Sequence, residues 1–368
     1  MSGDVARAVA YVVSSELIAA SSQLPSNKNR SSTVHSLIHA FGLSKRVKVL
    51  RPHRASYKDL CVYHTREYLD AVLSPQSSTD INEAFGLDSD CPPFPLLPAY
   101  VSLVAGSALT AVQALISNTA QITICWDGGR HHAQKGEAAG FCYVADCVLA
   151  LMALKRAPPR SPGEHKPRTM YIDLDLHFSD AVSQAFASSS ASRVPQILTL
   201  SIHHASPGFY PASPLSSLPT PTDPSFSPYT LSLPLHPGAS SHTYARLLPI
   251  LTRLKSTFSP SYIVLQCGVD ALAGDPCGIS NWSLEGLNAF VSEVLRWRIP
   301  TMMLGGGGYD TPNAARAWTS LTAIALGEPL ALDAQIPDHK LFPLYAPSFT
   351  VSDSWYLLTS EADWHGGA

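Results

Sequence analysis

Short apolar runs alternate with longer segments of mixed apolar and polar residues along most of the chain. The apolar runs predict strands, and the segments between them carry the longer periodicity of helices. Strands are expected at 5–13, 47–50, 122–126, 170–174, 196–202, 262–267 and 300–304. Helices are expected at 34–41, 56–72, 100–117, 142–155, 240–256, 283–298 and 312–327. The alternation predicts an α/β fold with a central parallel sheet covered on both faces.

The stretches between these elements are irregular and rich in Pro, Ser and charge. Residues 76–98 and 156–168 read as loops, and residues 211–228 form a Pro/Ser-rich segment without periodicity. Such composition predicts a long loop rather than a packed element. The chain contains no internal repeat, so residues 1–368 are interpreted as a single domain.

Charge and cysteine usage limit the possible partners and compartments. Only 14% of residues are charged, against about 25% in a typical domain, and the net charge is −3. No positive field therefore favours nucleic acid or anionic membrane, and neither partner is expected. No apolar run looks long enough to cross a bilayer, and the start lacks signal-peptide character. Seven scattered cysteines without a Cys-x-x-Cys pair indicate a reducing compartment, cytosol or nucleus.

The expected strand at 170–174 carries polar residues at its end. Asp173, Asp175 and His177 follow one another at a spacing of two, which points all three side chains the same way in an extended chain. Buried carboxylates are costly unless they are paired, hydrogen-bonded or bound to a metal. Asp and His together suit zinc. The alternative is a polar strand end that merely caps a loop.

Polar groups also follow other expected strands, at 131–132, 201–204, 270 and 309. The carboxyl ends of parallel strands share one edge of the sheet, where ligands bind, so one common site is the simplest explanation. A catalytic zinc usually has three protein ligands and one open position. Asp175, His177 and Asp270 make such a set.

Two adjacent histidines, His131 and His132, follow a glycine turn. Neighbouring residues on a turn seldom reach one ion together, so we interpret them as bases oriented by carboxylates. Asp173 and Asp180 are the spare carboxylates, one for each histidine. Histidines that are simply satisfied within a core are the alternative.

A run of four glycines at 305–308 precedes Tyr309. The run lacks the Gly-Lys-Ser/Thr ending of a phosphate loop. We therefore interpret it as a turn that lets the backbone approach a ligand and presents the tyrosine to an oxyanion. An ordinary glycine turn with a packed aromatic is the alternative. The sequence has no Gly-x-Ser-x-Gly elbow and no cysteine placed beside a base, which argues against covalent catalysis.

Taken together, these motifs resemble those of the zinc-dependent histone deacetylases, over about residues 9–345. The resemblance lies in Gly-Gly-Arg-His-His-Ala at 128–133, Gly-Phe-Cys-Tyr at 140–143, Tyr-Ile-Asp-Leu-Asp-Leu-His at 171–177, Ser-Pro-Gly-Phe at 206–209, Gly-Val-Asp at 268–270, Ala-Gly-Asp-Pro at 273–276 and Gly-Gly-Gly-Gly-Tyr at 305–309. The segments Phe-Cys-Tyr-Val at 141–144 and Ile-Pro-Asp-His at 336–339 are similar to class I members. The implied fold is the arginase/deacetylase α/β/α sandwich.

The resemblance also implies roles for individual residues. It makes Asp175, His177 and Asp270 the zinc ligands, pairs His131 with Asp173 and His132 with Asp180, and makes Tyr309 the oxyanion-stabilising residue. It lines an acetyl-lysine tunnel with Gly140, Phe141, Tyr210 and Cys277, sets Asp90 at its rim and puts Arg30 beneath the site. A monovalent cation, usually potassium, is implied at Asp173, Asp175, His177, Ser201 and Ile202.

Several positions differ from the usual class I pattern: Phe178-Ser179 replaces the common His-Gly, and the Pro/Ser-rich residues 211–228 replace a glycine-rich segment. Tyr210 stands where these enzymes carry Phe, Cys277 where they carry Leu or Met, and Arg130 where they carry Leu or Trp. Members that need a corepressor share a Gly- and His-containing segment before the first arginine and a basic residue soon after the tyrosine. Here residues 21–26 and Pro312 occupy those places, so activity without a corepressor complex is expected.

The implied function is zinc-dependent deacetylation of acetyl-lysine in proteins, with the nucleus, and also the cytoplasm, as locations. A histone tail and a cohesin subunit both fit as substrates. The alternatives are an acetylpolyamine amidohydrolase of the same superfamily, a less favoured arginase-like dimanganese enzyme, and a scaffold that binds acetyl-lysine or a corepressor without catalysis.

Overall fold

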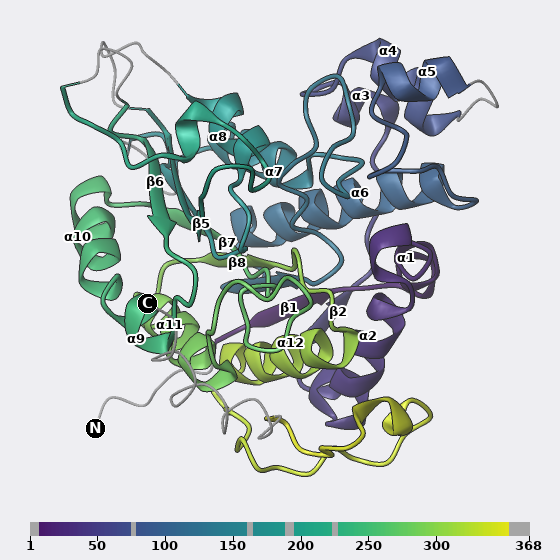
Figure 1. Cartoon of the computed structure of the whole chain (residues 1–368), viewed down its shortest axis with the longest axis vertical. Coiled ribbons are helices and arrows are strands. Elements are labelled where there is room, and N and C mark those ends of the chain that lie inside the picture. The colour runs from purple at the N-terminus through teal and green to yellow at the C-terminus, as the bar shows by residue number, and fades with distance from the viewer. Residues whose placement is uncertain (1–6, 75–78, 160–164, 188–194, 223–226, 353–368) are drawn as a thin grey trace.

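A sheet of parallel strands forms the centre of the fold (Figure 1). The computed structural model describes residues 7–74, 79–159, 165–187, 195–222 and 227–352. In these residues eight strands pair in the order β2-β1-β3-β8-β7-β4-β5-β6, and every pair is parallel. Their bounds are β1 Val9–Val12, β2 Lys48–Leu50, β3 Ile122–Cys125, β4 Thr169–Asp173, β5 Ile197–His204, β6 Thr230–Leu235, β7 Tyr262–Gln266 and β8 Thr301–Leu304.

Both faces of the central strands are buried, which explains why these strands are almost continuously apolar. Strand β4 shows the alternation: Met170 and Ile172 join the core cluster on one face, and Tyr171 joins the cluster on the other. Its neighbour β7 divides in the same way, with Ile263 on the first face and Val264 on the second. The sheet therefore separates two hydrophobic cores.

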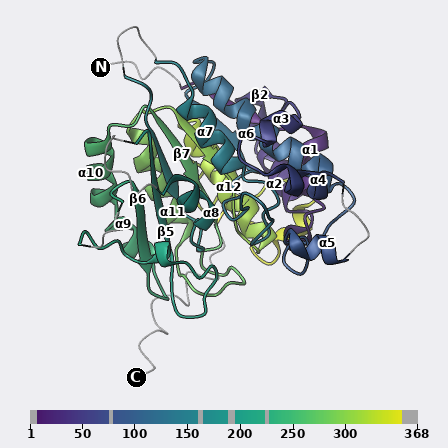
Figure 2. The same cartoon turned by 90° about the horizontal axis from the view of Figure 1, so that it is seen from above.

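Helices cover each face and complete a three-layer α/β/α sandwich (Figures 1 and 2). The core on one face includes residues of α1 Ser15–Ser21, α4 Arg66–Leu73, α6 Leu97–Ile116, α7 Asp146–Lys155 and α8 Asp180–Phe186. The other core includes residues of α2 Arg30–Ala40, α9 Ser241–Ala245, α10 Leu248–Phe258, α11 Leu284–Arg296 and α12 Thr311–Ala325. In Figure 1, α6 and α7 lie above the central strands and α12 lies below them. The predicted fold class is confirmed.

Helix α6 is long and apolar enough to cross a membrane by length and composition alone. The expectation that no apolar run reaches this length is therefore wrong for residues 97–116. Most of the helix is buried inside the fold, where it packs against α7, α1 and β3. The central helix of a large core meets the same criteria, so α6 is only a weak sign of membrane insertion.

Several elements differ from the sequence prediction, each for a local reason. The predicted helix at 56–72 is two helices, α3 Tyr57–Leu60 and α4, because the Thr65 side chain accepts the N–H of Tyr68 and starts a new helix. The helix expected at 240–256 likewise divides into α9 and α10, with Pro249 in the first turn of α10. The short helices α1, α5 Thr79–Ala84 and α8 were not predicted.

Seven of the eight described strands were predicted, and β6 is the one that the sequence did not predict. Its Pro234 reads as a strand breaker, but β6 is the edge strand next to β5, where one missing N–H can be tolerated. The segment before it was expected to be a loop over residues 211–228. That segment contains one short 3-10 turn, Pro214–Ser216, and residues 223–226 lie outside the described residues. Leu215 accepts a hydrogen bond from Ser232, which holds the turn against β6.

Candidate active site

The turns after β3, β4, β7 and β8 meet at the carboxyl edge of the sheet. Two glycine turns pack backbone to backbone there: a Cβ on Gly129 would lie 2.2 Å from the Gly305 carbonyl oxygen. A Cβ on Gly307 would lie 2.2 Å from a carboxylate oxygen of Asp270. Only glycine permits these approaches. The glycine run therefore brings the turn after β8 against the acidic residues of its neighbours.

Asp175, His177 and Asp270 form one compact group of donor atoms. His177 Nδ1 lies 3.3 Å from Asp175 Oδ1 and 2.9 Å from Asp270 Oδ2. The remaining oxygen of each carboxylate is held by the protein. Asp175 Oδ2 accepts the Gly307 N–H at 2.7 Å, and Asp270 Oδ1 accepts the Leu176 N–H at 2.8 Å. One oxygen of each aspartate is therefore left facing the imidazole nitrogen.

These three donor atoms fit a zinc ion. Ligand atoms about 3 Å apart can each reach an ion at the 2.0–2.2 Å expected for zinc with nitrogen and carboxylate ligands. The electrostatics also favour a cation, because two carboxylates are buried side by side. Burial and the neighbouring Asp175 raise the pKa of Asp270, although His177 opposes the rise. Burial would raise the pKa of Asp175, but His131 and His177 hold it well below its usual range.

The two adjacent histidines lie beside this group, each bonded to a different carboxylate. His131 Nδ1 is 2.9 Å from Asp173 Oδ2, and His132 Nδ1 is 2.7 Å from Asp180 Oδ1. The second Asp180 oxygen accepts a hydrogen bond from Gln134 at 2.8 Å. The imidazole rings are 4.0 Å apart between centroids and are tilted by 55°.

Different surroundings give these two histidines opposite pKa shifts. Burial opposes a charge on His131, but Asp173 and Asp175 outweigh it and raise the pKa to about 9. Burial and the charge of His131 lower the pKa of His132 to about 4, although Asp180 opposes that shift. At neutral pH one histidine is therefore charged, and its neighbour is neutral and able to accept a proton.

Tyr309 lies beside the acidic group at the end of the glycine run. Its N–H donates to Asp275 Oδ2 at 2.7 Å, and its ring meets Phe141 edge to face at 5.8 Å. Burial and the nearby Asp270 and Asp175 raise the pKa of the Tyr309 hydroxyl well above its usual value. The hydroxyl therefore keeps its proton at neutral pH and can donate it in a hydrogen bond.

Three polar residues position the site but were given no role in the sequence analysis. Gln266 donates to Asp175 at 2.9 Å, and Asp275 holds the N–H of Tyr309. Asp146 accepts the N–H groups of Gly129 and Arg130 at 2.9 and 2.8 Å, which fixes the turn that carries the histidines. The available signal was weak: Gln266 is a polar residue that ends an apolar strand, and Asp146 is an acidic residue in an apolar helix.

Comparison with known proteins identifies the family of this chain. The histone deacetylase domain matches residues 24–325. The chain is 37% identical over 356 residues to histone deacetylase 8 of Danio rerio, covering 95% of this chain and 89% of the relative. It is 36% identical over 348 residues to histone deacetylase 8 of Xenopus tropicalis, covering 93% and 89%. The chain belongs to the histone deacetylase family.

Membership makes this protein a hydrolase of the histone deacetylase class, and it supports a dependence on zinc. The parallel sheet and its two helical layers agree with the arginase/deacetylase fold implied by the resemblance. The other residues expected at the substrate site of this histone deacetylase can therefore be examined in the same structure.

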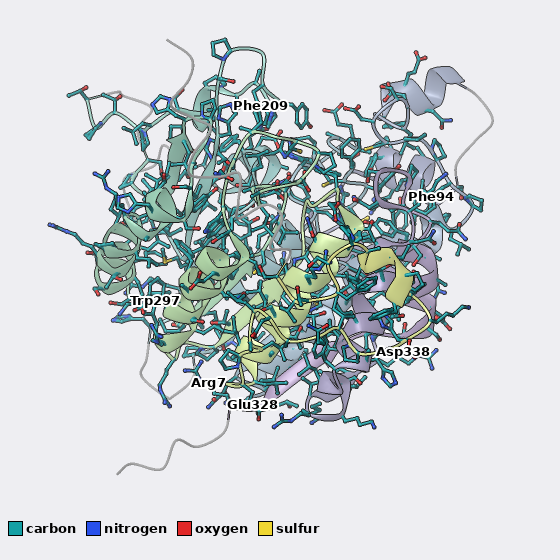
Figure 3. The ribbon with its side chains drawn as sticks, turned by 60° about the horizontal axis from the view of Figure 1, so that its bottom comes forward. Arg7, Phe94, Phe209, Trp297, Glu328 and Asp338 are labelled. Atoms are coloured by element: carbon teal, nitrogen blue, oxygen red, sulfur yellow. The ribbon has the colours of Figure 1, made fainter. Side chains whose placement is uncertain are left out.

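Aromatic residues surround the histidines on the outer side of the site. The Tyr210 ring is 41% exposed and lies 5.0 Å from the His132 ring. Phe209 stacks on His177 at 5.2 Å, and Figure 3 shows Phe209 at the edge of the molecule. A Cβ on Gly140 would lie 2.5 Å from the His132 ring and 2.8 Å from the Tyr210 hydroxyl. Gly140 therefore leaves room for both side chains.

The residues expected at the rim and beneath the site differ in their exposure to solvent. Asp90 is exposed, and it contributes with burial and Asp180 to a raised pKa of the Tyr210 hydroxyl. Arg30 is buried, donates to the Gly308 carbonyl at 2.7 Å and lies over the Trp318 ring at 4.8 Å. Burial and the nearby Arg130 lower the pKa of Arg30 to about 10. Arg130 donates to the Asp127 carbonyl, and both arginines line a small internal cavity.

The residues expected to bind a monovalent cation lie on the neighbouring strands β4 and β5 and in the turn that follows β4. Asp173 of β4 is directly opposite Ser201 of β5, and both are buried. Asp173 also accepts the Asp175 N–H at 3.1 Å and receives a hydrogen bond from the Tyr171 hydroxyl. Ile202 is fully buried. Asp173, Asp175 and Ser201 therefore supply oxygen atoms in one buried region.

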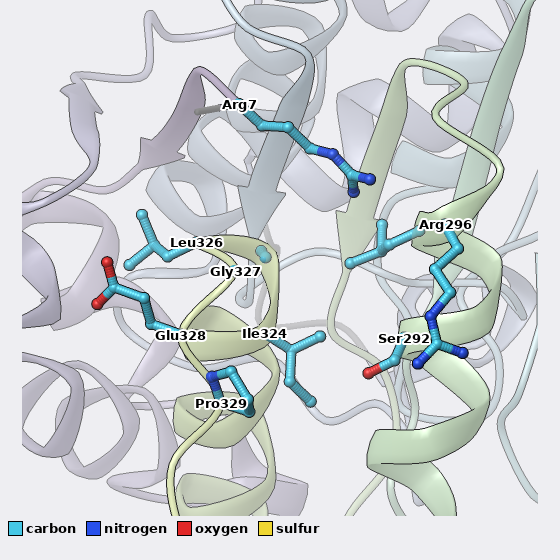
Figure 4. Close-up of a pocket in the computed structure, with 10 residues that line it drawn as sticks. Arg7, Ser292, Arg296, Ile324, Leu326, Gly327, Glu328 and Pro329 are labelled. Carbon is cyan, nitrogen blue, oxygen red and sulfur yellow. The ribbon is translucent and has the colours of Figure 1, made fainter. Parts of the chain in front are cut away.

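A second cavity, of about 460 Å³, contains none of the predicted site residues (Figure 4). It lies beside the end of α12, and Arg7, Ser292, Arg296 and Glu328 are among its lining residues. Arg296 forms an ion pair with Glu293, and Glu328 forms one with Arg46. This cavity is separate from the histidine and aspartate group.

Proposed function

We propose that this chain is a zinc-dependent protein lysine deacetylase that hydrolyses the acetamide of N6-acetyl-lysine and releases acetate. The observation that carries the proposal is the convergence of Asp175, His177 and Asp270 beside a neutral histidine and a protonated tyrosine. Membership of the histone deacetylase family supports the same reaction. The proposed catalytic unit is one domain that includes the whole sheet.

In this proposal Asp175, His177 and Asp270 hold the zinc ion. Bound zinc would supply Lewis-acid chemistry by polarising the acetamide carbonyl and the attacking water. His132 Nδ1 is engaged by Asp180, so its Nε2 is the atom that takes a proton from water and later gives it to the lysine amine. The Tyr309 hydroxyl donates to the carbonyl oxygen as negative charge develops there.

The remaining roles concern charge and substrate position. His131, held by Asp173, supplies a positive charge next to the reacting atoms. The acetyl-lysine side chain is proposed to lie between Phe141 and Tyr210, with Gly140 giving it room. Asp90 is proposed to hold the substrate backbone at the rim.

Further proposals follow from the family resemblance and concern ions, substrates and location. Asp173, Asp175, His177, Ser201 and Ile202 are proposed to bind potassium. The substrate is proposed to be a nuclear protein, and a histone tail and a cohesin subunit both have the required chemistry. The nucleus is the proposed location.

The decisive experiment measures metal content and deacetylation together. Purified protein should contain about one zinc per chain and release acetate from an acetyl-lysine peptide faster than from an acetylpolyamine. Asp175→Ala should lose both zinc and activity. Asp338→Ala is the matched control, because Asp338 is an exposed carboxylate remote from Phe209 in Figure 3. A variant Asp175→Ala that keeps stoichiometric zinc would refute the ligand assignment, and faster turnover of acetylpolyamine would favour the small-molecule alternative.

We also propose that activity does not need a corepressor. Two features of the sequence support this proposal. Pro312 stands where members that need a corepressor carry a basic residue, and residues 21–26 contain neither Gly nor His. An inositol phosphate bridging a corepressor would lack these contacts. The isolated chain should therefore deacetylate a peptide at a rate that a corepressor domain plus inositol phosphate does not increase. An isolated chain that is inactive until both are added would contradict this proposal.

A further inference from the structure

Cys277 lies in the turn that follows Asp270, next to the proposed zinc ligands. It is a free, partly exposed cysteine. Its Sγ, a ligand nitrogen of His177 and a carboxylate oxygen of Asp270 all lie within 4.8 Å of one another. Among the described residues, this is a group of three side chains of metal-binding type, and two of its members already belong to the proposed zinc site.

The backbone around Cys277 is fixed by the same carboxylate that holds the catalytic tyrosine. The Cys277 N–H donates to Asp275 Oδ1 at 3.0 Å, while Asp275 Oδ2 accepts the Tyr309 N–H at 2.7 Å. Asp275 therefore determines where the thiol and the tyrosine lie relative to each other. The turn that carries the thiol is therefore held in place beside the site.

We propose that the Cys277 thiolate is a fourth protein ligand of the zinc held by Asp175, His177 and Asp270, and that substrate displaces it. The inference rests on the proposed function. Zinc binds thiolate sulfur at about 2.3 Å and imidazole nitrogen at about 2.0–2.1 Å. Rotation of the Cys277 side chain about its Cα–Cβ bond changes the position of the sulfur relative to His177 and Asp270, so the thiolate can adjust to a bound ion. On binding, the S–H bond breaks, a sulfur–zinc bond forms, and the proton passes to solvent.

This ligand would block the site when no substrate is present. A catalytic zinc needs one position for the reacting oxygen, and a bound thiolate fills that position. The acetyl-lysine carbonyl must then replace the sulfur, which regains a proton from solvent. Leu or Met, which class I members carry at this position, cannot supply a thiolate, so the device would belong to this chain.

The test replaces zinc with cobalt and records the absorption spectrum. Wild-type protein should show a thiolate-to-cobalt charge-transfer band, and a saturating acetyl-lysine peptide should remove it. Cys277→Leu and Cys277→Ser should bind cobalt without the band. Cys61→Ser is the matched control, since Cys61 is the other partly exposed cysteine, and it should keep the band. Competition with a chelator should show that Cys277→Ser binds cadmium at least about tenfold more weakly.

The possible outcomes separate this inference from the proposed function. Stoichiometric cobalt without the band in wild type would overturn the thiolate ligand and leave the deacetylase proposal standing. A band that persists in both Cys277 variants would assign the sulfur to another cysteine and overturn the inference. A band that persists with peptide bound would overturn displacement by substrate. Failure of the wild-type protein to bind either zinc or cobalt would instead refute the proposed metal site itself.

Discussion

Replacing Tyr309 with Phe removes one hydroxyl and little else from this site. In the described part of the chain no side chain accepts a hydrogen bond from that hydroxyl, so its loss leaves no orphaned partner. The backbone bond from Tyr309 to Asp275 and the ring contact with Phe141 both remain. The variant should therefore fold normally, with an unfolding free energy close to that of the wild type.

The catalytic cost should be large, because the hydroxyl is expected to interact with charge that develops only in the transition state. Loss of one oxyanion donor typically reduces turnover by about 10²–10³, or about 2.7–4 kcal/mol. Substrate binding should change far less than kcat, since the missing interaction is weak in the ground state. Zinc content should be unchanged, because the three proposed ligands are untouched.

The assay measures kcat and KM on an acetyl-lysine peptide, with zinc determined on the same samples. Tyr345→Phe is the matched control, because its buried hydroxyl also lacks a hydrogen-bond partner in the described structure. A Tyr309→Phe enzyme with nearly full kcat and normal zinc would remove this residue from the mechanism. Such a result would also weaken catalysis as the function, relative to simple binding of acetyl-lysine.

Two further predictions concern stability and metal retention. His64 is buried, its Nε2 accepts the Ala145 N–H at 3.0 Å, and burial lowers its pKa to about 4. Because the unfolded chain binds this proton more readily, stability should fall as the pH drops from about 6.5 towards 4, by about 2 kcal/mol at pH 5. Urea unfolding at pH 7 and 5 should show a smaller loss in His64→Gln, and equal losses would contradict the assignment. In Gly307→Ala the new Cβ would lie 2.2 Å from a carboxylate oxygen of Asp270, so the metal affinity measured by chelator competition should fall at least about tenfold. Gly136→Ala is the control: its Cβ would have no atom closer than 3.8 Å, and its metal affinity should match that of the wild type.

The sequence predicts the sheet well because most strands are buried on both faces and therefore read as continuous apolar runs. Strand β4 is the clearest case, since Met170 and Ile172 are buried on one face and Tyr171 on the other. Strand β6 was not predicted because Pro234 and the preceding Pro/Ser-rich segment suggest a loop. An edge position, which decides whether a proline is acceptable, depends on the pairing order of the strands and cannot be seen in a local window.

The sequence points to a site residue most clearly where a charged side chain ends a buried strand. Asp173, Asp175 and His177 stand out because charge at the end of a buried strand needs an explanation. Gln266 and Asp275 do not stand out, because single polar residues at strand ends and in turns are common. Their contribution is visible only in three dimensions, where Gln266 bonds Asp175 and Asp275 bonds the Tyr309 backbone.

The adjacent histidines show most directly what a sequence leaves undetermined. His131 and His132 are chemically identical, yet the structure gives the first a raised pKa of about 9 and the second a lowered pKa of about 4. His131 lies near Asp173 and Asp175, which outweigh the cost of its burial. Burial lowers the pKa of His132 more than Asp180 and Asp175 raise it, and the charge of His131, 4.0 Å away between ring centroids, lowers it further. His132 therefore owes part of its low pKa to His131, so a substitution that neutralises His131 should raise the pKa of His132 as well as remove a positive charge from the site.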